Sequence, residues 1–165
     1  MDWWEEFLGQ SLFLATAAPG VVEMSLTPPI SAGNIRLNSD FDLGNGIRIR
    51  SVSVDELDDQ QVQIIIYWEA LQPITEDYSV AVHLVAQDPP QSELDLLDQA
   101  DNAHPVAGFY PTTRWQVGEI VRDDYLINIP TESQPAAIRL GMYRTDPDEG
   151  FVNTPWLSLP LPKST

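Results

Sequence analysis

Proline limits the fold of this chain more than any other residue type, because it occurs 14 times in 165 residues and is spread throughout. A proline inside a helix removes a hydrogen bond and clashes with the preceding turn, at a cost of about 3 kcal/mol. Long helices are therefore disfavoured. The segments between the prolines alternate apolar and polar residues with a period of two, which is typical of β-strands. The sequence predicts an all-β protein.

Six segments carry the strand pattern, and they are Gly46–Val54, Gln61–Leu71, Tyr78–Ala86, Ile120–Ile129, Ala136–Thr145 and Phe151–Leu161. In the first of them the apolar phase slips between Ile49 and Val52, which predicts a β-bulge. The second and third are joined by a short turn at Pro73, and we expect them to form an antiparallel hairpin. The inward-facing residues predicted for the second, third and fifth segments are Val62, Ile64, Ile66, Trp68, Val80, Val82, Leu84, Ile138, Leu140 and Met142.

The stretches between these strands read as turns and loops. Acidic turns are predicted at Asp55–Asp59 and Asp146–Gly150 from their composition. Gln87–Gly108 is the one long irregular stretch, with a single helical turn expected at Glu93–Asp98. About seven or eight strands at fairly regular spacing predict a single antiparallel β-sandwich, immunoglobulin-like or jelly-roll in topology, over residues 25–165.

The first part of the chain, residues 1–24, is expected to be an amphipathic or irregular segment that precedes the sandwich. Trp3, Trp4 and Phe7 follow helical spacing, which is compatible with a short N-terminal helix. Such a helix would pack on the domain's own surface, or it would dock against another protein or a second copy of this chain.

The chain is strongly acidic, with 8 Lys and Arg residues against 25 Asp and Glu residues and a formal net charge of −17. This charge repels phosphate backbones and anionic lipids, so we expect neither nucleic-acid binding nor docking on a membrane surface. Cysteine is absent, which excludes disulfides, thiolate chemistry and cysteine-based zinc sites. No stretch approaches the roughly 18–20 apolar residues of a membrane-spanning helix, so we expect no direct membrane span.

Catalytic and metal-binding signatures are missing from the sequence. It contains neither a nucleophile elbow nor a glycine-rich phosphate loop. His83 and His104 are too few for a histidine-rich metal site, and the acidic runs Asp55–Asp59, Glu93–Asp101 and Asp146–Glu149 lack the spacing of an EF-hand. We therefore expect no enzymatic activity, no cofactor and no metal. Calcium binding by the acidic loops and a soluble hydrolase are the alternatives.

Four stretches carry a resemblance to a known family, and they are Ile64–Leu71 (IIIYWEAL), Asp77–Leu84 (DYSVAVHL), Gln99 with Asp101, and Tyr110–Trp115 (YPTTRW). From Phe41 to Tyr143 the chain resembles the C-terminal β-sandwich domain of bacterial membrane glycosyltransferases of the dolichyl-phosphate-mannose mannosyltransferase type. The resemblance implies an extracytoplasmic domain that takes part in cell-envelope glycan assembly beside a membrane subunit. Because the catalytic acid of these transferases lies in their membrane part, the resemblance implies no catalytic residue here. The chain lacks the membrane helices and has a longer acidic insertion at Ser92–Asp98, so we expect a fragment or a free-standing relative.

The first candidate site is one face of the predicted sandwich. If the strands that contain Tyr67, His83 and Tyr143 are neighbours in one sheet, these side chains share an exposed surface with Glu69 and Arg139. An aromatic platform flanked by hydrogen-bonding groups suits a sugar, whose C–H face stacks on rings while its hydroxyls bond to polar atoms. The alternative is an ordinary solvated sheet face with weak cross-strand pairs.

The second candidate site is the pair Arg114 and Trp115, in the loop before the fourth predicted strand. A loop tryptophan can stack on a ligand, and a neighbouring arginine can bind a carboxylate or phosphate in bidentate fashion. In the alternative, Trp115 caps one end of the core while Arg114 pairs with Asp101 or Asp123 and fixes the long loop to the sheet.

These features together predict a non-catalytic accessory domain associated with cell-envelope glycosyl transfer, which binds a glycan or an acceptor. The alternative is a protein–protein interaction module without sugar affinity. In that alternative Trp3, Trp4 and Phe7 would mediate docking or self-association.

Overall fold

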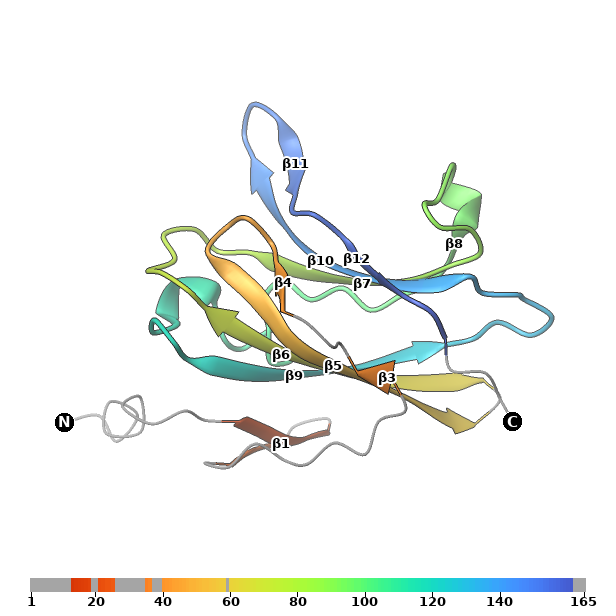
Figure 1. Ribbon diagram of the computed structural model, residues 1–165, viewed down its shortest axis with the longest axis horizontal. Coiled ribbons are helices and arrows are strands. Elements are labelled where there is room, and N and C mark those ends of the chain that lie inside the picture. Colours follow the sequence, from red (N-terminus) through yellow and green to blue (C-terminus); the bar gives the residue numbers. More distant parts are fainter. Residues whose placement is uncertain (1–12, 19–20, 26–34, 37–39, 59, 162–165) are drawn as a thin grey trace.

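The computed structural model describes residues 13–18, 21–25, 35–36, 40–58 and 60–161. In this part of the chain the protein is nearly all β-structure, and two antiparallel sheets pack face to face (Figure 1). The strands are β1 (Phe13–Ala18), β2 (Val21–Ser25), β3 (Ile35–Arg36), β4 (Phe41–Asp42), β5 (Ile47–Asp58), β6 (Gln61–Ala70), β7 (Ser79–Val85), β8 (Leu96–Gln99), β9 (Ile120–Asn128), β10 (Ala137–Asp146), β11 (Gly150–Asn153) and β12 (Leu157–Leu159). Two single-turn 3₁₀ helices are η1 (Glu93–Asp95) and η2 (Thr112–Arg114).

The first sheet, here called the β6 sheet, has the order β3-β5-β6-β9, and β4 also pairs with β5. The second, here called the β10 sheet, has the order β11-β10-β7-β8, and β12 also pairs with β10. β1 and β2 form a separate hairpin that lies beside β9 (Figure 1). The predicted antiparallel β-sandwich is confirmed. The strands outnumber the prediction because each sheet has one edge made of two short pieces, β3 with β4 and β11 with β12, and because β8 and the β1–β2 hairpin were not predicted.

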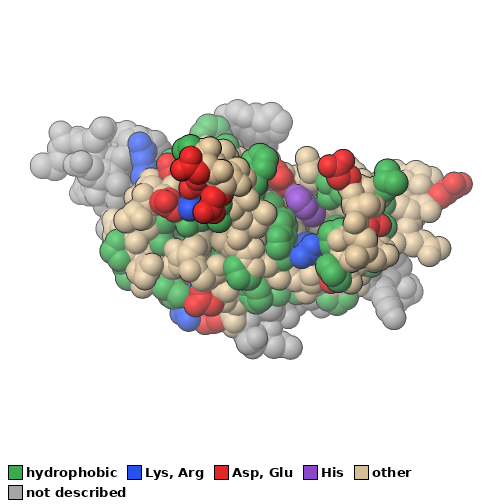
Figure 2. Space-filling model, turned by 90° about the horizontal axis from the view of Figure 1, so that it is seen from above, with side chains coloured by type: hydrophobic (Ala, Val, Ile, Leu, Met, Phe, Trp, Pro, Cys, Tyr) green, Lys and Arg blue, Asp and Glu red, His purple; other side chains and the backbone are tan. Residues whose placement is uncertain are grey.

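Two segments project from the outer face of the β10 sheet: the turn between β10 and β11, and the stretch around η1 before β8 (Figure 1). Figure 2 views this face from above and shows acidic side chains on both projecting parts. A histidine and a basic side chain lie between them, next to hydrophobic side chains. The two projections thus border the central part of this face.

The predicted hairpin between the second and third segments is wrong. β6 pairs with β5 and β9, whereas β7 pairs with β10 and β8, so the connection around Pro73 crosses from one sheet to the other. Two strands with one apolar face each can bury those faces side by side in one sheet or opposite each other across a core. Alternation of residues does not distinguish the two arrangements.

Two of the predicted loops are partly strand. Asp55–Asp58 belongs to β5 and pairs with the start of β6, so the acidic run Asp55–Asp59 is not a turn as predicted, and Asp59 lies outside the described residues. The stretch Gln87–Gly108 contains η1, where a helical turn was expected, but it also contains β8, which pairs with β7. The end of β5 and the whole of β8 were missed because their acidic residues are typical of loops.

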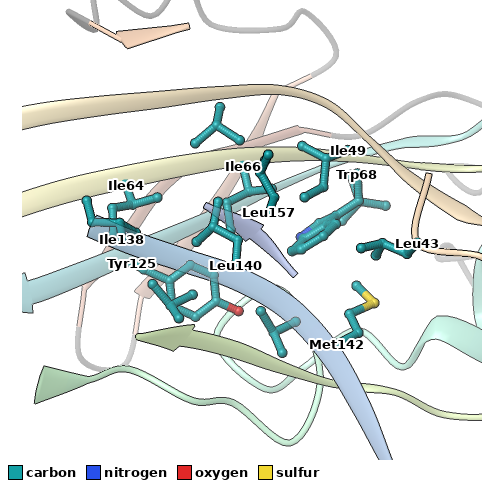
Figure 3. Close-up of a cluster of buried hydrophobic side chains, with 14 of the residues drawn as sticks. Leu43, Ile49, Ile64, Ile66, Trp68, Tyr125, Ile138, Leu140, Met142 and Leu157 are labelled. Atoms are coloured by element: carbon teal, nitrogen blue, oxygen red, sulfur yellow. The ribbon is translucent and has the colours of Figure 1, made fainter. Parts of the chain in front are cut away.

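The core lies between the sheets and consists of the inner faces of both. The inner faces predicted for β6, β7 and β10 are confirmed, since all ten of the residues predicted to face inward are 0% exposed. The Trp68 ring fills the centre of the cluster in Figure 3, between Ile49 and Ile66 of its own sheet and Leu157 of the other. The predicted bulge in β5 is also confirmed, because the register with β6 shifts between Ile49 and Ser51.

The outer faces of the sheets are less solvated than the alternation suggested. On β6, Ile65 and Tyr67 are only 7% and 8% exposed and pack with Ile120 of β9. On β7, Ala81 and Val85 are each 1% exposed. The central strands are therefore covered on both sides.

A carboxylate is buried within the apolar core. Asp123 on β9 is 0% exposed and accepts hydrogen bonds from Trp68 Nε1 (3.1 Å), the Tyr125 hydroxyl (2.6 Å) and the Val106 backbone amide (2.8 Å). Burial raises the pKa of Asp123 to about 7, although these three donors act to lower it. Val106 has a φ of 58°, which β-branched residues rarely adopt. The Asp123 side chain therefore holds the segment after β8 against β9 in a strained conformation.

The turn before β5 requires a glycine at position 46. Gly46 has a φ of 86°, and a Cβ atom at this position would lie 2.6 Å from Cγ of Gln72. The Leu71 amide donates to the Gly46 carbonyl at 2.7 Å. This close approach joins the turn before β5 to the crossing between β6 and β7.

Candidate functional site on the outer face of the β10 sheet

The central feature of this face is Trp156, in the short break between β11 and β12. Before it, the Thr154 amide donates to the Met142 carbonyl (2.8 Å), and the Thr154 hydroxyl accepts from the Met142 amide (2.9 Å). A side-chain oxygen thus replaces a backbone carbonyl at this point of the ladder. Trp156 lies against Gly141 of β10, where an added Cβ would be 3.2 Å from its Cε3 atom. The glycine lets the indole approach the strand backbone.

Two basic side chains from adjacent strands contact this indole. His83 on β7 and Arg139 on β10 are register partners, so both project from the same face of the sheet. The ring centroids of His83 and Trp156 are 5.0 Å apart, with the planes tilted by 39°. Cζ of Arg139 lies 5.0 Å from the centroid of the Trp156 ring, within the range of a cation–π interaction.

Each basic side chain is paired with a carboxylate from a loop. His83 Nε2 lies 3.2 Å from Asp101 Oδ1, which also accepts from the Val82 amide at 3.2 Å. Arg139 Nε lies 3.5 Å from Asp88 Oδ1. That distance is an ion pair without a good hydrogen bond, and it agrees with the absence of a hydrogen-bond partner for this buried Nε among the described residues. Two acid–base pairs therefore lie beside Trp156.

A second aromatic pair extends the same face. Tyr143 lies two residues beyond Gly141 on β10 and so projects from the same side of the strand. Its ring contacts that of Phe151 edge-on, with centroids 5.5 Å apart and planes at 79°. Phe151 is 71% exposed. Aromatic rings therefore follow β10 from Trp156 to the projecting turn.

The structure brings together three of the residues predicted for the first candidate site and separates two. His83, Arg139 and Tyr143 share the outer face of the β10 sheet. Tyr67 and Glu69 belong to the β6 sheet, because the predicted hairpin does not form. Tyr67 is 8% exposed, and Glu69 forms ion pairs with two arginines of β5.

The second candidate pair, Arg114 and Trp115, does not form a surface site, because the Trp115 side chain is buried. Trp115 is 4% exposed and belongs to the core, with its ring beside that of Tyr110. The predicted pairing of Arg114 is wrong, because Asp101 bonds to His83 and Asp123 is enclosed in the core. Arg114 is exposed in η2.

Sequence reasoning missed Trp156, the residue at the centre of the site. Gly141 offered a signal, because a glycine inside a strand pattern often marks the close approach of another group. The break in alternation at Thr154 and Pro155 offered a second signal that the edge strand is interrupted there. The tryptophans and phenylalanine predicted for self-association, at positions 3, 4 and 7, lie outside the described residues.

Comparisons of this chain with models of protein families, with curated proteins and with solved structures found no match. The resemblance to the glycosyltransferase domain therefore stays a prediction. In the described part of the chain, no helix is long and apolar enough to cross a membrane. The same part contains no group of three or more His, Cys, Asp or Glu side chains arranged to hold a metal ion.

Replacing Gly141 by valine is expected to move the Trp156 indole away from β10, because the added Cβ alone would lie 3.2 Å from the ring. Because the added side chain overpacks a buried position, the free energy of unfolding should fall by about 1–3 kcal/mol. The ring-proton chemical shifts of His83 report the movement, since this ring lies 5.0 Å from Trp156. His104 is the internal control and should keep its shifts. Unchanged His83 shifts would contradict the described packing.

Proposed function

We propose that this protein is a non-catalytic accessory domain that binds glycans on the outer face of the β10 sheet. The observation that carries the proposal is the position of Trp156, which lies against Gly141 and contacts His83 and Arg139, each paired with a carboxylate. A pyranose presents an apolar face of C–H groups and a rim of hydroxyls. An aromatic ring with fixed polar groups beside it matches both parts of such a ligand.

The polar groups around Trp156 are held in place before any ligand binds. The backbone amide of Val82 and the His83 ring fix Asp101, and the Ser158 hydroxyl donates to Asp88 at 3.1 Å. Groups that are already ordered lose little conformational entropy on binding, which favours affinity. The rings of Tyr143 and Phe151 lengthen the surface beyond Trp156, so the face suits an oligosaccharide better than a single sugar.

The biological context of the proposal comes from the sequence resemblance alone. It supports a location outside the cytoplasm beside a membrane glycosyltransferase. In that context the domain would hold a glycan or an acceptor close to the enzyme while the membrane part performs the transfer.

Binding to an array of cell-envelope oligosaccharides tests the proposal, with Trp156→Ala beside the parent protein. We expect selective binding by the parent and a loss of about tenfold or more in affinity for the variant, equivalent to about 1.4 kcal/mol. Phe109→Ala is the matched control, because Phe109 is an aromatic residue that is 73% exposed in the loop after β8, and it should bind as the parent does. A folded parent that binds no glycan, or equal binding by Trp156→Ala, would contradict the proposal.

A further inference from the structure

The basic side chains of the candidate site are each paired with a carboxylate. Arg139 pairs with Asp88, and its side chain is 17% exposed. His83 pairs with Asp101, and its side chain is 24% exposed. Recognition of a carboxylate, sulfate or phosphate on a sugar needs an accessible cation with free N–H donors. Both side chains are poorly accessible, and each faces a carboxylate that competes with an anionic ligand.

Asp88, by contrast, has a hydrogen-bond acceptor that is free to bind a ligand. Asp88 uses Oδ1 for both Arg139 and Ser158, and its Oδ2 atom receives no hydrogen bond from the described residues. An ionised carboxylate is an acceptor only. It therefore suits hydroxyl or amino groups of a sugar and repels a second carboxylate.

The surroundings of the site add to this repulsion. Acidic side chains lie on both projecting segments that border the face (Figure 2), and the chain has a net charge of −17. Where the structure describes arginine side chains, those that form ion pairs with carboxylates are Arg48, Arg50, Arg122, Arg139 and Arg144. Little positive charge therefore remains to attract an anionic glycan.

We infer that the outer face of the β10 sheet selects sugars whose functional groups are hydroxyls or amines and rejects sugars that carry carboxylate, sulfate or phosphate groups. This inference rests on the proposed glycan binding. The discrimination arises from the carboxylates that face Arg139 and His83 and from the free acceptor oxygen of Asp88.

Matched sugar forms test the selectivity. An array should present glucose, galactose and mannose oligosaccharides, each as the neutral, the amino and the uronic acid form, at about 50 mM and 500 mM salt. These two concentrations correspond to strong and weak charge repulsion. We expect the acidic form to bind about tenfold or more weakly than its neutral parent at low salt, with a smaller difference at high salt.

The variant Asp88→Asn tests whether this carboxylate causes the discrimination against acidic sugars. It removes one negative charge and releases Arg139, so the ratio of acidic-form to neutral-form affinity should rise about fivefold or more. Asp148→Asn is the matched control on the same face, since Asp148 is exposed in the turn between β10 and β11, and it should change that ratio by less than about twofold. Preferential binding of the acidic forms by the parent, or an unchanged ratio in a folded Asp88→Asn, would overturn the inference while leaving glycan binding intact. Binding to no sugar form at all would overturn the proposed function, and the inference with it.

Discussion

Replacing Asp123 by alanine should lower the free energy of unfolding by about 3–5 kcal/mol, as expected when a buried polar group loses its partners. The variant leaves Trp68 Nε1, the Val106 amide and the Tyr125 hydroxyl without their acceptor in the core. It also leaves a cavity where the carboxylate stood. In addition, the Val106 amide loses the hydrogen bond that holds this residue at a positive φ.

Urea unfolding of the parent, of Asp123→Ala and of a control measures this effect. Leu126→Ala is the control, because Leu126 lies on the same strand but is 47% exposed, and its truncation should cost less than about 1 kcal/mol. A loss below about 1 kcal/mol in Asp123→Ala would show that the three bonds to this carboxylate contribute little to stability.

The stability of the protein should fall as the pH rises from about 4 to about 7. Burial raises the pKa of Asp123 from its ordinary value of 3.8 to about 7. Between these values the folded protein keeps a proton that the unfolded chain has released, so each rise in pH favours unfolding. The stabilisation is complete below about pH 4 and lost above about pH 7, with a slope near 1.4 kcal/mol per pH unit from a single group.

Asp123→Asn provides the comparison, since it cannot titrate at this position. We expect the free energy of unfolding of the parent to fall more steeply with pH than that of the variant over pH 4–7. Asp124, whose pKa burial also raises, titrates in both proteins and cancels in the difference. The hydrogen bond from Arg144 lowers the pKa of Asp146 to about 2. The titration of Asp146 therefore changes the free energy of unfolding only below about pH 4, and there it makes stability rise with pH. Equal slopes in the two proteins would contradict a protonated Asp123 in the fold.

The sequence predicts the faces of the strands well, because burial of one face of a pleated strand imposes a period of two on its residues. Even the bulge near Ser51 is visible as a slip in that pattern. The partners of each strand are not visible, since pairing depends on where the connections cross between the sheets. The assignment of Tyr67 to the candidate site failed for this reason alone.

In the candidate site, too, some residues can be predicted from the sequence and others cannot. His83, Arg139 and Tyr143 lie on the outward phase of their strands, and that phase can be read along the chain. Their neighbour Trp156 lies in the break between β11 and β12, where the Thr154 hydroxyl bonds to β10 in place of a backbone carbonyl. Asp123 occupies the apolar phase of β9, between Val121 and the buried Tyr125, and a carboxylate at such a position signals a buried polar network.

The most direct measurement is a titration of the ¹⁵N-labelled protein with neutral, amino and acidic oligosaccharides, followed by NMR. If the outer face of the β10 sheet binds glycans, the indole N–H of Trp156 and the amides of His83, Gly141 and Tyr143 will show saturable shifts with the neutral or amino forms. The indole N–H of the buried Trp115 will not move. Saturable shifts confined to residues away from this face, or no shifts with any oligosaccharide, would contradict the proposed function.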